Sequence, residues 1–104
     1  MPTDATFTIA ADHPALAGHF PGNPIVPGVL VLEHVQKALE ARVGPVRLTG
    51  VPQAKFLSPL RPDETCVIVF TGVADGNARF DCRSGARTIA RGNLRFDADA
   101  SRAG

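Results

Sequence analysis

The pattern of apolar and polar positions predicts one strand, a stiff loop and one long helix in the first half of the chain. Residues 5–11 alternate Phe7 and Ile9 with polar or small residues, which is typical of a half-buried strand. Residues 28–43 carry apolar side chains around most of the first half of a helix, and Gly44-Pro45 ends it. A helix that is apolar nearly all round is expected to be buried.

Four later stretches have the composition or alternation of strands, namely residues 46–57, 65–73, 78–83 and 88–96. Asp75-Gly76 and Ser84-Gly85 predict tight turns between them. An antiparallel sheet that wraps around the single apolar helix is the economical way to cover it, so the pattern predicts an α+β fold. We expect residues 1–104 to form one domain with a frayed tail at residues 97–104.

Composition and charge exclude several classes of function. Eleven basic and ten acidic residues give a net charge of +1, and their scatter along the chain forms no basic run of the kind that binds nucleic acid or membranes. The longest unbroken apolar run, residues 29–32, is too short to span a bilayer. Cys66 and Cys82 form no C-x-x-C pair, so a zinc site is not expected, and two isolated thiols fit the reducing cytoplasm.

Two ionisable residues are candidates for acid–base chemistry. His19 lies in the stiff loop of residues 12–27, which contains four prolines, and Glu33 lies in the apolar part of the helix. A carboxyl group among Val and Leu side chains loses hydration, which favours its protonated form, and a neutral imidazole can accept a proton. Taken singly, each residue has an ordinary structural explanation, and the pattern alone gives no reason to prefer His19 over His13 or His34 as a candidate.

Gly28 adds a third candidate at the start of the helix. Its N–H is one of the donors without a partner inside the helix, at the positive end of the helix dipole. Such a donor can polarise a carbonyl oxygen, and a glycine lets a ligand approach the backbone closely. A simple helix start is the alternative explanation.

Residues 19–33 (HFPGNPIVPGVLVLE) closely resemble the signature of the bacterial 3-hydroxyacyl-[acyl-carrier-protein] dehydratases. That signature is H-F-P-x-x-P-x-x-P-G-V, with an acidic residue on the helix fourteen positions after the histidine, which is the spacing of His19 and Glu33. Residues 50–64 (GVPQAKFLSPLRPDE) resemble a second segment of the family more weakly. The resemblance implies a hotdog fold, with the sheet wrapped around the central helix, and a homodimer whose active site combines residues of both subunits.

The resemblance also implies roles for individual residues. His19 would take a proton from C2 of a 3-hydroxyacyl thioester, Glu33 would assist departure of the C3 hydroxyl as water, and the Gly28 N–H would bind the thioester carbonyl. Phe20, Pro27 and Val29 would lie beside the substrate. No metal or redox cofactor is needed, because the acyl group is carried on the phosphopantetheine of acyl carrier protein. Lys55 and Arg61 are candidates for docking this acidic carrier.

Two other functions remain open at this point. An acyl thioesterase of the same fold could use Glu33 to position water at the thioester carbonyl. A non-catalytic subunit that binds the acyl carrier is suggested by the chain's beginning close to its first predicted strand, whereas the family usually extends further before it. The presence of both His19 and Glu33 argues against this last alternative.

Overall fold

The computed structural model of the chain describes residues 3–16 and 25–99. In chain order the elements are strand β1 (Ala5–Thr8), a short 3-10 helix η1 (Pro14–Leu16), helix α1 (Gly28–Val43), and strands β2 (Val46–Phe56), β3 (Thr65–Ala74), β4 (Asn77–Ser84) and β5 (Arg87–Ala98). The predicted helix and the four later strands are therefore present, with ends that differ by a few residues at most. No helix among the described residues has the length and apolar character needed to cross a membrane.

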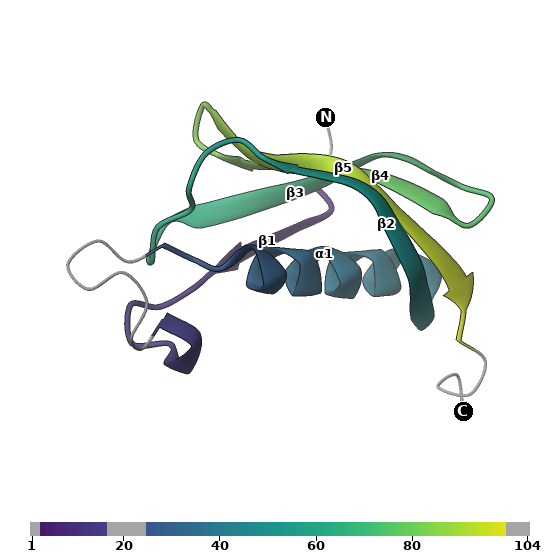
Figure 1. Ribbon diagram of the computed structural model, residues 1–104, viewed down its shortest axis with the longest axis horizontal. Coiled ribbons are helices and arrows are strands. Elements are labelled where there is room, and N and C mark those ends of the chain that lie inside the picture. Colours follow the sequence, from purple (N-terminus) through teal and green to yellow (C-terminus); the bar gives the residue numbers. More distant parts are fainter. Residues whose placement is uncertain (1–2, 17–24, 100–104) are drawn as a thin grey trace.

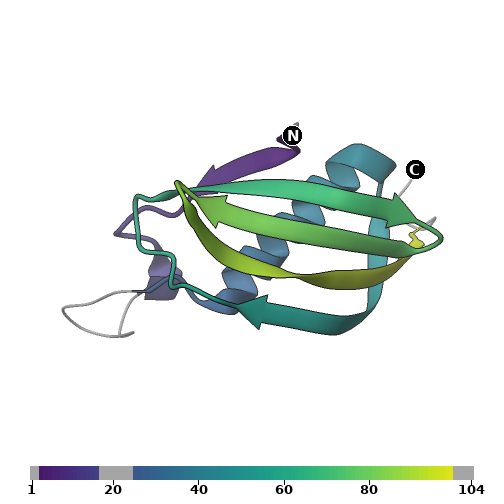
Figure 2. The ribbon, with the colours of Figure 1, turned by 90° about the horizontal axis from the view of Figure 1, so that it is seen from above.

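The strands form one antiparallel sheet in the order β1-β3-β4-β5-β2, and α1 lies across one face of it (Figures 1 and 2). Asp75 and Gly76, with φ of 53° and 73°, make the tight turn between β3 and β4 that the Asp-Gly pair predicts. β2 pairs with β5 along one side only, so within the described residues its other side is a free edge. The α+β prediction is confirmed.

The core lies between the helix and the inner face of the sheet. In β4, Ala78, Phe80 and Cys82 are buried, while the residues between them point to the opposite face. The buried residues of α1 are Val31, Val35, Ala38 and Leu39, which follow helical spacing. Cys66 and Cys82, from neighbouring strands, are both buried free thiols.

The prediction that the first half of α1 is buried nearly all round is wrong for this chain. Only the side toward the sheet is covered, whereas Glu33 is exposed and Val29 is 64% exposed. A helix turns by about 100° per residue, so Glu33, two residues after the buried Val31, points to the opposite side. A single sheet layer can cover only one side of a helix, and the apolar pattern alone does not show which side remains open.

Candidate active site

The start of α1 is the best-defined part of the predicted site. Pro27 precedes the helix with φ of −59° and ψ of 142°, and Gly28 is its first residue. The Gly28 N–H therefore lies at the positive end of the helix dipole, where no carbonyl within the helix can accept from it. His19 and Phe20 lie outside the described residues.

The ring of Phe56, at the end of β2, lies directly against Gly28. A methyl group added at Gly28 would come within 2.9 Å of the Phe56 Cζ atom. The absence of a side chain at Gly28 thus allows the aromatic ring and the first turn of the helix to meet. Phe56 itself is 49% exposed, so the ring borders an open space.

An apolar pocket of about 290 Å³ opens beside Gly28 and Phe56. Its walls come from the start of α1, the end of β2, the following loop and β5. The lining residues are Ile25, Val26, Gly28, Val31, Phe56, Leu57, Ser58, Pro59, Leu60 and Ile89. This volume is at the small end of the usual range for small-molecule sites, and the lining suits a short hydrocarbon group.

The loop after β2 forms one wall of this pocket and is tied to both of its neighbours. The Leu57 N–H donates to the Ile89 carbonyl of β5 at 2.8 Å. The Val26 N–H donates to the Leu60 carbonyl, also at 2.8 Å. Because Val26 immediately precedes Pro27-Gly28, the position of this loop is coupled directly to the start of the helix.

Arg87 and Glu64 fix the far side of the same loop. Arg87, at the start of β5, donates through Nη1 to the Pro59 carbonyl at 3.1 Å and through Nη2 to Glu64 Oε2 at 2.7 Å. The other oxygen of Glu64 accepts the Arg61 N–H at 2.8 Å. This backbone N–H, together with the Arg87 guanidinium, holds the pKa of Glu64 below its ordinary value. One arginine thus connects β5 to the pocket wall through two acceptors.

Replacing Arg87 by Gln should loosen the pocket wall without removing any group that reaches the reacting atoms. We expect KM for an acyl substrate to rise several-fold, with a smaller change in kcat, because binding in the pocket weakens before chemistry does. Arg87→Lys should recover part of the loss, since Lys keeps the charge but not the two-pronged geometry. Steady-state kinetics would measure this. Arg47→Gln is the control, because the Arg47–Asp97 ion pair is far more exposed to solvent than the Arg87–Glu64 pair. An unchanged KM in Arg87→Gln would remove Arg87 from this role.

His34 has a structural position on α1. Its ring stacks on that of Phe7 from β1, with the ring centres 4.2 Å apart and the planes nearly parallel. Burial, reinforced by the nearby charge of Lys37, lowers the pKa of His34 from its ordinary value of 6.5, while Glu33 opposes this shift. His34 therefore joins β1 to the helix in its neutral form.

The lowered pKa of His34 predicts a pH dependence of stability. Between the folded-state pKa and 6.5 the unfolded chain binds more protons at this residue, so the free energy of unfolding falls as the pH drops through that window. His34→Phe keeps a ring against Phe7 and removes the titration. Thermal unfolding at about pH 5 and about pH 7.5 should show a smaller difference for this variant than for the unmodified chain. Equal differences in the two proteins would contradict the assignment.

Glu33 does not line the apolar pocket. It borders a separate shallow depression of about 220 Å³ on the open side of α1, together with Gln36, Lys37 and Glu40. The expectation that Glu33 is surrounded by Val and Leu side chains is therefore wrong within a single chain. Gly28 and Glu33 are on the same helix but face different spaces.

Comparison with known proteins decides the family. The model of the ApeI-like family, described as ApeI dehydratase, matches residues 2–93. The chain belongs to this family of dehydratases. Residues 2–93 include His19, the whole of α1 and the walls of the apolar pocket.

Curated relatives are 3-hydroxyacyl-[acyl-carrier-protein] dehydratases named FabZ. The protein of Haemophilus influenzae (strain PittEE) is 32% identical over 97 residues, covering 73% of this chain and 66% of the relative. That of Chlamydia trachomatis serovar L2 is 29% identical over 102 residues, covering 85% of this chain and 67% of the relative. The chain thus spans about two thirds of the length of these relatives.

Solved structures of similar shape confirm the hotdog fold that was predicted. The dehydratase heterocomplex ApeI:P of Xenorhabdus doucetiae matches with a TM-score of 0.76 and 21% identity, covering 88% of this chain and 82% of that one. A hypothetical protein of Aquifex aeolicus matches with a TM-score of 0.70 and 11% identity, covering 91% and 95% of the two chains. At these identities the likeness concerns the fold alone.

The structure adds three residues to the site that sequence reasoning did not select. Phe56 lies in the second family-like segment and contacts Gly28, so its place in that segment was the available signal. Arg87 and Glu64 are distant in sequence, and only the pairing of the strands brings them together.

Among the described residues no group of three or more His, Cys, Asp or Glu side chains could hold a metal ion.

Proposed function

We propose that this chain removes water from 3-hydroxyacyl thioesters carried on acyl carrier protein and forms trans-2-enoyl thioesters. The observation that carries the proposal is the family match over residues 2–93, which covers the helix with Gly28 and Glu33 and the apolar pocket beside Gly28. The FabZ relatives, at about 30% identity, are named for this activity. The acyl chain would lie in the pocket, with its thioester carbonyl at the Gly28 N–H.

The reaction needs one proton acceptor and one proton donor. His19, as neutral imidazole, takes the proton from C2, and the electron pair of that C–H bond forms the C2=C3 double bond. The C3–O bond breaks, and the leaving hydroxyl takes a proton from Glu33 to depart as water. The Gly28 N–H stabilises the negative charge that develops on the thioester oxygen, and the helix dipole adds to this effect. No metal or redox cofactor takes part.

A second copy of the chain would complete the site. The side of α1 that carries Glu33 is open, and large apolar side chains are exposed at Val29, Val51, Phe56 and Leu57, near the free edge of β2. Contiguous apolar patches and unpaired strand edges are typical of surfaces that another chain covers. Covering this side would withdraw Glu33 from water and favour the protonated form that the mechanism requires. As the resemblance implies, His19 of one subunit would then face Glu33 of the other.

The size of the assembly distinguishes a homodimer from the alternatives. Size-exclusion chromatography with light scattering of the purified chain should give twice the mass of the monomer. The Xenorhabdus doucetiae neighbour is a heterocomplex, so a monomer that becomes active only with a second hotdog chain would replace the homodimer by a heterodimer. The two buried free thiols, Cys66 and Cys82, fit our placement of the reaction in the reducing cytoplasm.

The direct test is an assay with a (3R)-3-hydroxyacyl thioester, followed by mass spectrometry and by the ultraviolet absorbance of the conjugated enoyl product. The enoyl thioester should be supplied in parallel, because the reaction is reversible and hydration should be seen. Free acid and thiol without an enoyl product would make the chain a thioesterase. Tight binding of the acyl carrier without any product would make it a non-catalytic subunit.

A further inference from the structure

The outer face of the sheet, away from α1, carries an excess of positive charge. Six of the eleven basic residues point outward on the adjacent strands β4, β5 and β2, where buried side chains alternate with exposed ones. Five of them are here called the outer basic surface, namely Lys55, Arg79, Arg83, Arg91 and Arg95. Asp81 lies among these five, whereas the sixth, Arg47, pairs with the outward-facing Asp97 further along β2 and β5. The scatter of charges along the sequence therefore becomes a cluster once the strands pair.

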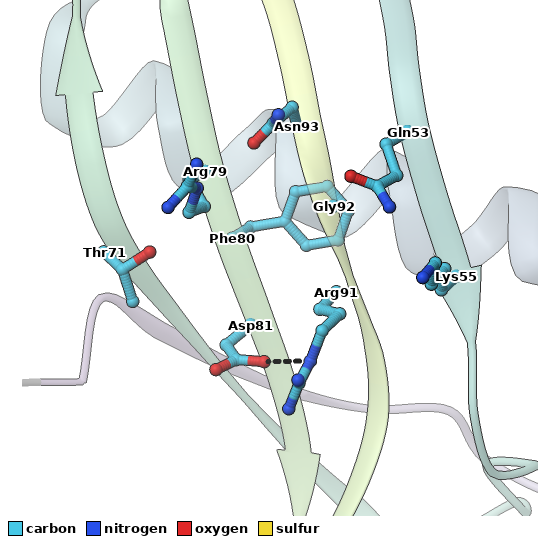
Figure 3. A pocket seen from close by; sticks show the side chains of 9 residues that line it. All are labelled: Gln53, Lys55, Thr71, Arg79, Phe80, Asp81, Arg91, Gly92 and Asn93. Carbon is cyan, nitrogen blue, oxygen red and sulfur yellow. Dashed lines mark ion pairs between the residues drawn. The ribbon is translucent and has the colours of Figure 1, made fainter.

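A hollow of about 350 Å³ lies in the middle of this surface. Figure 3 shows its polar side chains on the open face of the sheet, with the helix behind. Besides Phe80 and Gly92, the lining residues are Gln53, Lys55, Thr71, Arg79, Asp81, Arg91 and Asn93. Gln53, Thr71 and Asn93 can donate hydrogen bonds, so the hollow combines three cations with neutral donors.

The charges in the hollow are only partly balanced. Asp81 contacts Arg91 at 3.5 Å and Arg83 at 3.7 Å, and its side chain is only 21% exposed. Lys55 lies directly opposite Arg91 in the register of β2 and β5, and like charges in that position destabilise a sheet. No carboxylate in the described residues forms an ion pair with Lys55, Arg79 or Arg95. An anionic group bound between these side chains would remove the repulsion.

The surface lies close to the candidate active site. Lys55 and Phe56 are consecutive in β2, so their side chains point to opposite faces of the sheet. The Phe56 ring contacts Gly28, whereas Lys55 lines the hollow. A molecule seated on the outer basic surface is thus separated from the start of α1 by the thickness of one strand layer. A long flexible arm attached to that molecule can reach the pocket around the end of β2.

We propose that the outer basic surface is where the acidic carrier protein docks while its acyl arm enters the active site. The proposal rests on the proposed function, and it selects Lys55, Arg79 and Arg91 as the docking residues. Arg61, the other candidate from the sequence, lies in the loop after β2 and does not line the hollow. A second copy of this chain cannot dock through the same surface, because equal charges would meet. Three cations would not be needed to bind an uncharged acyl group.

The test compares one acyl group on two carriers. The same 3-hydroxyacyl group is attached either to purified bacterial acyl carrier protein or to free pantetheine. Turnover of both substrates is measured with the unmodified chain and with the double variant Lys55→Gln/Arg79→Gln. We expect kcat/KM of the double variant for the carrier-linked substrate to fall at least about tenfold, through a rise in KM. The kcat/KM for the pantetheine substrate should be unchanged, because charges at the rim of a docking surface mainly affect the rate at which the two proteins associate. Added salt should weaken carrier-linked turnover of the unmodified chain more than that of the variant.

Arg47→Gln is the matched control, because Arg47 is an exposed arginine of β2 already paired with Asp97. It should leave both substrates unaffected. An equal fall with both substrates in the double variant would show a structural effect, and unchanged carrier-linked turnover would place docking elsewhere. Either result would overturn the proposal.

Binding of the carrier without its acyl group, measured by fluorescence anisotropy, separates this proposal from the proposed function. If the unmodified chain turns over neither substrate but binds the carrier through Lys55 and Arg79, the dehydratase function fails and the docking surface stands. If it turns over pantetheine thioesters but binds no carrier, only the docking surface fails. Equally strong binding of short DNA or of anionic lipid vesicles would show a surface that does not select a carrier protein, and would also overturn the proposal.

Discussion

Replacing Glu33 by Gln is expected to lower turnover of a 3-hydroxyacyl thioester by about 10²–10⁴-fold, the usual contribution of a general acid or base. Gln has nearly the same shape but no proton to give to the leaving hydroxyl. The fold should be unaffected, because Glu33 is exposed within the chain and forms no ion pair with any residue that the structure describes. The thermal midpoint and the size of the assembly should therefore stay as they are.

Glu40→Gln is the matched control for this variant. Glu40 lies two turns further along α1, beside the same depression, and its carboxylate accepts the Val46 N–H at 2.9 Å, which a Gln carbonyl oxygen can also do. Near-normal turnover in Glu40→Gln, with loss in Glu33→Gln, would locate the effect at one carboxyl group. If both variants lost activity equally, the negative charge of the helix, and not a proton from Glu33, would be the cause. His19→Ala should show a loss of similar size, since it removes the other half of the proton transfer.

Local signals were sufficient to predict most of the fold. Pro27-Gly28 and Gly44-Pro45 bound α1 because proline lacks the N–H that a helix interior needs and Gly44 takes a φ of 92°. Alternation in β4 follows from the pleat, which sends Phe80 inward and Arg79 outward. The first strand ends at Thr8, three residues before the predicted end, because no partner in β3 extends beyond Thr65.

The surroundings of Glu33 could not be predicted in the same way. Apolar residues such as Val29 can be buried by the chain's own sheet or by a second chain, and the sequence pattern is the same in both cases. The single sheet layer buries Val31 and Val35 and leaves Val29 and Glu33 open. In the dimer that we propose, the partner chain would cover the apolar residues on the open side of α1.

The outer basic surface was missed for a different reason. Lys55, Arg79 and Arg91 are separated by 12 to 36 positions, so no window of sequence contains a basic run. The pairing of β2 with β5 and of β5 with β4 places them side by side. The available signal was the spacing of four positions between Arg79 and Arg83 and between Arg91 and Arg95, which puts these residues on one face of their strands.

Replacing Gly28 by Ala should cost about 10²-fold in kcat/KM, the size expected when reacting groups are displaced by about 1 Å. The backbone of Gly28 is not in the left-handed region, so Ala can adopt it, and the helix should form as before. The new methyl group, however, would narrow the pocket beside the Gly28 N–H, where we propose that the thioester carbonyl binds. Kinetics with a pantetheine thioester and circular dichroism of the same samples would measure both effects.

The Phe56 ring offers a second explanation for such a loss, and the double variant Gly28→Ala/Phe56→Leu separates the two. The methyl group would lie 2.9 Å from the Phe56 Cζ atom, but that atom is the far end of a side chain that can turn away by rotation about its own bonds. The contact is therefore relieved at little cost, and we expect the double variant to remain as impaired as Gly28→Ala, with Phe56→Leu alone having a small effect. Recovery of activity in the double variant would mean that Gly28 serves to admit the ring. It would then be the shape of the pocket, and not the N–H at the start of α1, that requires a glycine at this position.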